Sequence, residues 1–171
     1  AACIRELKEK GYLLVAATNP LFPDTATRER IRWAGLNPED FELITTYENS
    51  LFCKPNLDYY RAILAEIGKE AEECLMVGND VGEDMCARNI GMEIFLLTDH
   101  KISREDVDED QFPQGDFEKL YSYVKSLPPA KTRDELLVER AEKDGFCKAA
   151  VISVEDLTFS PSFRQFCEMN L

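Results

Sequence analysis

Two short apolar runs that each end abruptly in small polar residues place the strongest constraint on the fold of this chain. Residues 13–20 read LLVAATNP and residues 74–86 read CLMVGNDVGEDMC. A continuous apolar run is typical of a strand that is buried on both faces, as in a parallel sheet. Ligands bind beyond the carboxyl ends of the strands in such sheets. The polar residues that follow the two runs are therefore candidates for a functional site.

Helix and strand patterns alternate through the first 127 residues. The helix after Asn56 is the best defined, because its apolar residues follow the i, i+3, i+4, i+7 spacing and Gly68 can end it. Strands that alternate with helices predict an α/β fold of three layers, a parallel sheet with helices on both faces. We expect strands over 12–17, 43–46, 75–77 and 94–97, and helices up to Gly11, from Asp24 or Thr25 to Gly35, from Asn56 to Gly68, over 82–90, and from Asp116 through Val124.

Residues 128–131, Pro-Pro-Ala-Lys, interrupt this alternation and are interpreted as a linker between residues 1–127 and 132–171. Thr132 and Glu135 have the spacing of a capping box, which predicts a helix that ends at Gly145. A strand is a further candidate over 151–154. The C-terminal segment is thus expected to be a short, α-rich piece, either a partial second domain or a helical extension of the first.

Charge and cysteine usage limit the partners and the compartment. Lys and Arg number 20 against 33 Asp and Glu, and the net charge of −13 argues against nucleic acid and anionic membranes, which are polyanions. No apolar stretch approaches the ~20 residues that span a bilayer, and the charged N-terminal sequence AACIRELKEKG is unlike a signal peptide. The six cysteines are scattered, so we expect reduced thiols and a cytoplasmic protein. His100 is the only histidine, which argues against a His-based triad or a His-rich zinc site.

Two pairs of polar residues follow the apolar runs. Thr18 and Asn19 follow the first run, where a hydroxyl and backbone N–H groups can hold phosphoryl oxygens; the alternative is an ordinary turn. Asp80 and Asp84 follow the second run, and their spacing places both carboxylates on one face at a helix N-terminus. Carboxylates of this kind suit Mg²⁺, although the helix dipole alone also favours aspartate there.

A lysine lies between the two runs, just before the helix that Asn56 caps. Lys54 is followed by Pro55. An ammonium group at this point can reach a phosphoryl group or offset the mutual repulsion of the carboxylates. The alternative interpretation is a surface lysine that precedes a helix.

The order and spacing of these residues resemble the haloacid dehalogenase (HAD) superfamily of phosphohydrolases over about residues 1–127. AATNP around Thr18 and Asn19 resembles motif II, CKP with Lys54 resembles motif III, and VGNDVGED with Asp80 and Asp84 resembles motif IV. The resemblance implies a Rossmann-like core and Mg²⁺-dependent hydrolysis of a small phosphate ester through an aspartyl-phosphate. It also implies that Thr18 contacts the phosphoryl group and that Lys54 steadies it. Asp80 is then the Mg²⁺ ligand, with Asp84 in support.

The family's nucleophile belongs to a further motif, Asp-x-Asp, on a central strand between the strands of motifs II and IV. No Asp-x-Asp follows an apolar strand in this chain, since the aspartates at 106, 108 and 110 lie in an acidic run. We therefore expect an incomplete core, an internal fragment of a longer protein, and a chain that is inactive alone. We also expect the strands over 12–17 and 75–77 either to pair directly with each other or to leave the chain with low stability.

The C-terminal residues 136–171 resemble the opening of a cysteine-rich family of predicted metal-binding proteins. The resemblance includes only Cys167 of the expected cluster, and one cysteine cannot fill a four-ligand site. Two other functions remain open for the whole chain. One is a non-catalytic module that binds phosphate or Mg²⁺ or acts as a scaffold. The other is a receiver of the response-regulator type, which needs an acidic pair after the first strand and a late lysine at a strand end, and neither is evident.

Overall fold

The computed structural model describes residues 1–105 and 107–151. The chain divides into two compact units, Ala1–Pro129 and Ala130–Leu171, and each is described by itself. The division falls within the Pro-Pro-Ala-Lys segment, while the domain bounds expected from the sequence stay a prediction. Within the described residues, no helix combines the length and apolarity that crossing a bilayer requires.

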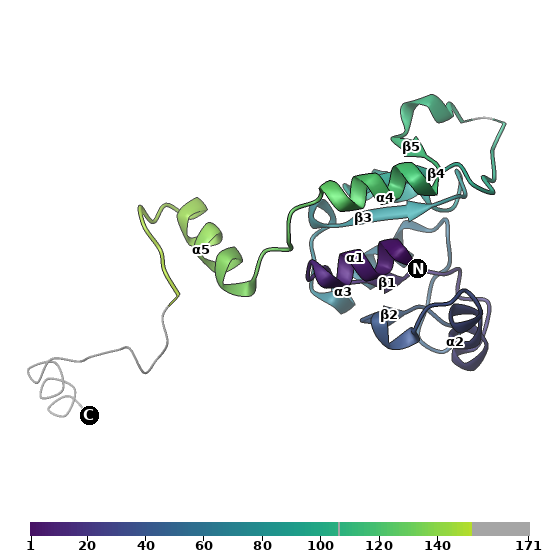
Figure 1. The fold of residues 1–171 in the computed structure, drawn as a ribbon, viewed down its shortest axis with the longest axis horizontal. Helices are drawn as coiled ribbons and strands as arrows, with labels where there is room; N and C mark the ends of the chain where they lie inside the picture. Colours follow the sequence, from purple (N-terminus) through teal and green to yellow (C-terminus); the bar gives the residue numbers. More distant parts are fainter. Residues whose placement is uncertain (106, 152–171) are drawn as a thin grey trace, which may run out of the picture. The chain divides into compact units, whose positions relative to one another are not determined.

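The first unit alternates strands and helices, and Figure 1 shows their arrangement. Its strands are β1 (Val15–Ala16), β2 (Leu43–Ile44), β3 (Leu75–Gly78), β4 (Glu93–Leu97) and β5 (Gln114–Gly115). Its α-helices are α1 (Ala2–Glu9), α2 (Asp24–Trp33), α3 (Leu57–Ile67) and α4 (Phe117–Ser126). Short 3₁₀ helices lie over Pro38–Asp40 (η1), Ala71–Glu73 (η2), Met85–Ile90 (η3) and Glu109–Gln111 (η4).

All strand pairs are parallel, which confirms the predicted α/β class, but the described strands form two sheets. β1 pairs with β2, and β4 lies between β3 and β5. The predicted direct pairing of the strands over 12–17 and 75–77 is wrong within the described residues, because β1 and β3 belong to different sheets. Side chains that follow the two strands bridge them instead: the Asn19 amide donates to the Glu83 carboxylate over 3.2 Å. The alternative expectation, low stability, stays a prediction.

Strand β1 differs from the expected strand that is buried on both faces. Only Val15 and Ala16 pair with a neighbour, and the whole run over 12–17 is half-buried or exposed. Leu13 exposes 43% of its surface. The physical reason is that β1 has a strand partner on one side alone, so its other edge lacks the cover that a central strand receives.

The segment over 82–90 is also different from the predicted α-helix. It is a turn followed by the 3₁₀ helix Met85–Ile90. The backbone N–H groups of Gly82 and Glu83 donate to the Asp80 carboxylate, over 2.8 and 2.9 Å. These bonds form a turn over residues 80–83, and the chain then continues as a 3₁₀ helix.

The helices with strong local end signals agree with the sequence. The Asn56 side chain accepts a hydrogen bond from the Asp58 N–H at the start of α3, and Gly68 ends that helix with a left-handed backbone, φ 63°. The Asp116 side chain caps α4 in the same way, by accepting from the Lys119 N–H. These signals involve residues close in sequence, and the two helices were predicted with nearly the observed bounds.

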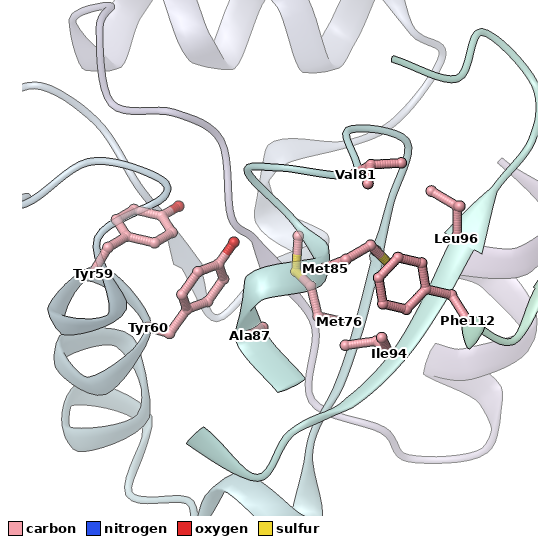
Figure 2. Packing of buried hydrophobic residues seen from close by; sticks show 9 residues of the cluster. All are labelled: Tyr59, Tyr60, Met76, Val81, Met85, Ala87, Ile94, Leu96 and Phe112. Carbon is pink, nitrogen blue, oxygen red and sulfur yellow. The ribbon is translucent and has the colours of Figure 1, made fainter. Parts of the chain in front are cut away.

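The strand β4 gives one face to each of two apolar clusters, as its period of two requires. Ile94 and Leu96 pack in a cluster with residues of α3, β3 and η3, which Figure 2 shows. Phe95 and Leu97 pack on the other side with residues of α4 and α1. The first unit thus has helices on both faces of the β3–β4–β5 sheet, as expected for three layers.

The described part of the second unit contains one helix, α5 (Arg133–Lys143). Thr132 and Glu135 form the predicted capping box: the Thr132 hydroxyl accepts from the Glu135 N–H over 3.2 Å, and the Glu135 carboxylate accepts from the Thr132 N–H over 2.7 Å. The candidate strand over 151–154 falls, apart from Val151, outside the described residues. Cys167, on which the metal-binding resemblance rests, also lies outside them.

Candidate functional site

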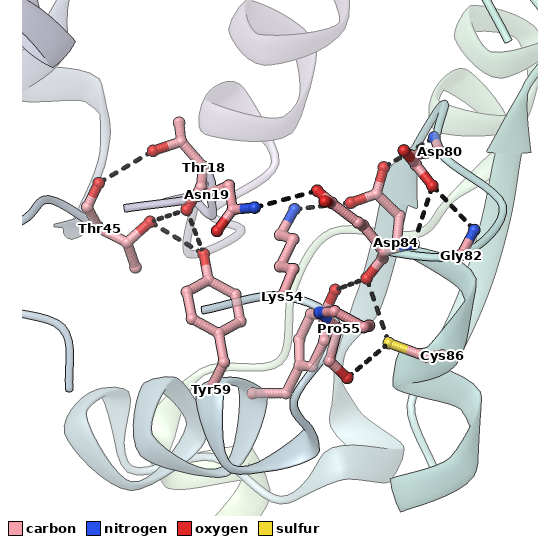
Figure 3. Close-up of polar contacts among 12 residues, drawn as sticks. Thr18, Asn19, Thr45, Lys54, Pro55, Tyr59, Asp80, Gly82, Asp84 and Cys86 are labelled. Atoms are coloured by element: carbon pink, nitrogen blue, oxygen red, sulfur yellow. Dashed lines mark hydrogen bonds and ion pairs between the residues drawn. The ribbon is translucent and has the colours of Figure 1, made fainter. Parts of the chain in front are cut away.

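The polar residues predicted from the sequence gather where β1 and β3 end, as Figure 3 shows. Thr18 and Asn19 follow β1, and Asp80 and Asp84 follow β3. Lys54 reaches them from the loop before α3, and its peptide bond to Pro55 is cis. The sheets are parallel, so this edge is where ligands bind in open α/β folds.

A buried ion pair lies at the centre of the group. The Lys54 ammonium lies 2.6 Å from Oδ1 of Asp84, and the two side chains are only 7% and 9% exposed. Lys54 is therefore not the surface lysine of the alternative interpretation. The ammonium also lies 5.9 Å from the centre of the Tyr59 ring, which is within the range of a cation–π contact. The protein thus holds a positive charge in a mostly dehydrated position next to both strand ends.

Close backbone approach positions Asp84. Its Oδ2 accepts a hydrogen bond from the Asp80 N–H over 3.0 Å. A Cβ atom on Gly78 would lie 2.1 Å from the same oxygen. Only glycine at this position leaves room for the carboxylate at the end of β3.

The Asp80 carboxylate has two unequal oxygens. Oδ1 accepts from the backbone N–H groups of Gly82 and Glu83. Arg104 brings its Nη2 to 3.4 Å from both Oδ1 and Oδ2. Within the described residues, this long contact is the only hydrogen bond of Oδ2. Of the two Asp80 oxygens, Oδ2 therefore has the greater remaining capacity for a ligand.

The residues after β1 are held by a hydroxyl network that the sequence did not reveal. The Thr18 hydroxyl donates to the Thr45 carbonyl over 3.0 Å. The Tyr59 hydroxyl donates to the Thr18 carbonyl over 2.7 Å and lies 2.9 Å from the Thr45 hydroxyl. Burial raises the pKa of Tyr59, so its hydroxyl stays a neutral donor. Oδ1 of Asn19 is buried and has no hydrogen-bond partner among the described residues.

Further residues complete the surroundings of the ion pair. The Tyr60 hydroxyl donates to the Glu83 carbonyl over 2.5 Å, and the Cys86 thiol lies 3.1 Å from the same oxygen. Burial raises the pKa of Cys86. Tyr60 is one of the residues with apolar spacing in the helix after Asn56, and that spacing gave no sign of a role for its hydroxyl. Cys86 carried no signal beyond its place after Asp84. Arg104 carried none, because its contact with Asp80 joins residues 24 apart in sequence.

The ligand set fits Mg²⁺ only in part. Among residues 1–105 and 107–151, no group of three or more His, Cys, Asp or Glu side chains is arranged to hold a metal ion. Each Asp84 oxygen accepts a short hydrogen bond, from Lys54 or from the Asp80 N–H, whereas Oδ2 of Asp80 has only the long contact with Arg104. Mg²⁺ is commonly held by one or two carboxylates together with water and substrate phosphate. The donors present therefore fit as one protein ligand of such an ion and no more.

Two hollows in the surface lie away from this site. One is lined by residues of α3 and η2, including Arg61 and Lys69, and another by residues of β4 and α4, including Phe95 and Tyr123. Neither is lined by Lys54 or Asp80. The site at the strand ends is defined by the buried Lys54–Asp84 pair and the contacts around Asp80.

The model of the haloacid dehalogenase-like hydrolase family matches residues 1–91 of the 171. The chain belongs to this family. The match confirms the HAD resemblance, and it spans Thr18, Asn19, Lys54, Asp80 and Asp84. No match was found among curated proteins.

Solved structures show the same fold. The chain is 18% identical to a HAD phosphatase from Thermococcus onnurineus, with a TM-score of 0.59 over 75% of this chain and 57% of that one. It is 18% identical to a predicted phosphoglycolate phosphatase from Haemophilus somnus 129PT, with a TM-score of 0.56 over 71% of this chain and 53% of that one. It is 15% identical to an uncharacterized protein from Listeria monocytogenes serotype 4b, with a TM-score of 0.54 over 73% of this chain and 78% of that one. The HAD chain thus spans little more than half the length of the first two proteins.

Proposed function

We propose that this HAD chain forms the part of a phosphohydrolase site that binds a phosphoryl group and Mg²⁺, with a small phosphate monoester as the substrate class. The observation that carries the proposal is the buried Lys54–Asp84 pair beside Asp80, at the carboxyl ends of parallel strands. A protein of net charge −13 needs a local cation to hold a phosphate dianion, and Lys54 supplies one.

The proposed roles follow from the contacts. The Lys54 ammonium donates to a phosphoryl oxygen while it keeps its bond to Asp84, because an ammonium has three donors and no acceptor. Thr18 and Asn19 line the end of β1, where the Tyr59 hydroxyl holds the Thr18 carbonyl in place. Oδ2 of Asp80 is the proposed Mg²⁺ ligand. The ion, when bound, supplies positive charge that offsets the charge of the phosphoryl oxygens.

Neither aspartate is suited to attack phosphorus. Asp84 is paired with Lys54 and also accepts from the Asp80 N–H. Oδ1 of Asp80 is engaged by two backbone N–H groups, and Oδ2 is the proposed metal ligand. The aspartyl-phosphate of the family mechanism is therefore not proposed on either residue. This observation favours a second candidate function, a module that binds phosphate and Mg²⁺ without turnover.

Hydrolysis of p-nitrophenyl phosphate by the purified chain separates these functions. The assay is run with and without MgCl₂ on the unsubstituted chain, on Asp80→Asn, and on Asp58→Asn. Asp58 is an exposed aspartate of α3 and provides a control with the same change of charge. Turnover that is lost only in Asp80→Asn supports the hydrolase. Absence of turnover, with Mg²⁺-dependent binding of orthophosphate that Asp80→Asn removes, supports the binding module. Absence of both contradicts the proposed site. The cytoplasm stays our proposed compartment, on the sequence argument alone.

A further inference from the structure

We propose that Arg104 is an internal counter-ion of Asp80 that competes with a divalent cation for Oδ2 of that carboxylate. The inference rests on the proposed metal-binding role of Asp80. Arg104 lies beyond the residues 1–91 that the family model matches, and outside all the motifs.

The position of the guanidinium carries the inference. Nη2 of Arg104 lies 3.4 Å from each oxygen of the Asp80 carboxylate. Oδ1 also accepts from the N–H groups of Gly82 and Glu83. Oδ2, in contrast, has Arg104 as its only hydrogen-bond partner among the described residues. The cation of the arginine therefore lies beside the oxygen that a metal ion would use.

Backbone hydrogen bonds hold the segment just before Arg104 against the loop that carries Asp80. The Val81 N–H donates to the Ile102 carbonyl over 3.0 Å, and the Ile102 N–H donates to the Asn79 carbonyl over 2.8 Å. The Asn79 side-chain amide adds a bond of 2.6 Å to the His100 carbonyl. Arg104 follows two residues after this parallel bridge, so its side chain starts close to the carboxylate.

Gly82 leaves the space that the side chain occupies. A Cβ atom at Gly82 would lie 2.7 Å from Nε of Arg104. A methyl group there would push the flexible end of the arginine outward. The substitution Gly82→Ala therefore offers a way to shift the guanidinium without removing its charge.

The two partners differ in a way that permits exchange. The Asp80 side chain is 12% exposed, whereas the Arg104 side chain is 50% exposed. A contact of 3.4 Å is longer than the bidentate pairs that bind strongly, and solvent screens it. A doubly charged ion can therefore displace the guanidinium into water. Until it does so, only the fraction of molecules with an open Asp80 is competent to bind metal, and the apparent affinity falls by that fraction.

Binding of Mn²⁺, followed by the loss of the free-ion signal in electron paramagnetic resonance, tests the inference. The set contains the unsubstituted chain, Arg104→Gln, Gly82→Ala, Asp80→Asn and Arg88→Gln. Arg88 is exposed and bonds to Gln111, so its substitution reproduces the change in net charge away from Asp80. We expect Arg104→Gln to lower the dissociation constant by about threefold to tenfold. Gly82→Ala should shift it in the same direction by less, and Arg88→Gln should leave it within about twofold.

The outcomes separate the two proposals. Mn²⁺ binding that requires Asp80 but is unchanged or weaker in Arg104→Gln overturns the role of Arg104 and leaves the metal site intact. An equal gain in Arg88→Gln also overturns it, because the effect is then one of net charge. Absence of binding in both the unsubstituted chain and Arg104→Gln overturns the metal role of Asp80 and, with it, the competition.

Discussion

Lys54 and Asp84 come from loops 30 residues apart in sequence and meet as a buried ion pair, with 2.6 Å between the ammonium and Oδ1. Burial removes water from both charges, so each depends on the other for compensation. The pair also fixes the distance between the loop before α3 and the end of β3. Its integrity is therefore expected to matter for folding as well as for ligand binding.

Removing one partner of this pair should be more harmful than replacing both. We expect Lys54→Met to lower the free energy of unfolding by about 3–5 kcal/mol, because it leaves the Asp84 carboxylate buried without a counter-ion. The double substitution Lys54→Met with Asp84→Leu should lose less than Lys54→Met alone, and therefore less than the sum of the two single substitutions. Urea unfolding of the three variants measures this coupling. Strict additivity would show that the two charges do not compensate each other.

A methyl group at Gly78 should displace Asp84. The added Cβ would meet the Asp84 carboxylate at 2.1 Å, so we expect Gly78→Ala to destabilise the chain by about 1–3 kcal/mol. Gly82→Ala is the matched control, since its Cβ meets only the flexible end of Arg104. Thermal unfolding of the two variants compares them. If both have the same midpoint, the space at Gly78 is not what positions the carboxylate.

The Tyr59 hydroxyl should stabilise the turn after β1. Tyr59→Phe removes one of two hydroxyl donors of the half-buried Thr18 carbonyl and leaves the Thr45 hydroxyl at 2.8 Å, so we expect a loss of about 0.5–1.5 kcal/mol. Tyr47→Phe serves as the control because Tyr47 is 71% exposed. Chemical unfolding measures both variants, and amide exchange at Thr18 and Asn19 reports the local effect. A neutral Tyr59→Phe with unchanged exchange would contradict the role of the hydroxyl.

Cys86 should react slowly with alkylating agents. Burial raises the pKa of its thiol, and the thiolate is the reactive form. Above the ordinary thiol pKa of about 8.5, an exposed thiol is already ionised, whereas Cys86 still gains thiolate as the pH rises. We expect iodoacetamide at pH 8 to label the exposed Cys53 at least about tenfold faster. Peptide mass spectrometry follows both sites, with urea-unfolded protein as the reference. Equal rates in the folded chain would refute the difference in environment.

The sequence predicted those elements whose signals are local. Asn56 and Gly68 bound α3 because a cap and a left-handed glycine act on their own helix ends. The ends of β1 and β3 were located correctly as well, since an apolar run followed by polar residues marks the edge of a parallel sheet. The convergence of Lys54 with Asp84 followed from that edge.

The parts that the sequence did not predict depend on partners distant along the chain. The separation into two sheets depends on which strands find neighbours, and the apolar run over 12–17 does not reveal this. The 3₁₀ helix at Met85–Ile90 stands where an α-helix was predicted, and it follows a turn whose N–H groups donate to the Asp80 carboxylate. The roles of Tyr59 and Arg104 come from contacts over 41 and 24 residues.

The most direct test of the central claim is a two-dimensional ¹⁵N–¹H NMR titration of the chain with orthophosphate in the presence of Mg²⁺. The proposed site predicts saturable shift changes concentrated at Thr18, Asn19, Lys54 and Asp80, and their loss in Asp80→Asn. Absence of saturable changes at these residues, or changes of the same size elsewhere on the surface, would contradict a phosphoryl-binding site at the ends of β1 and β3.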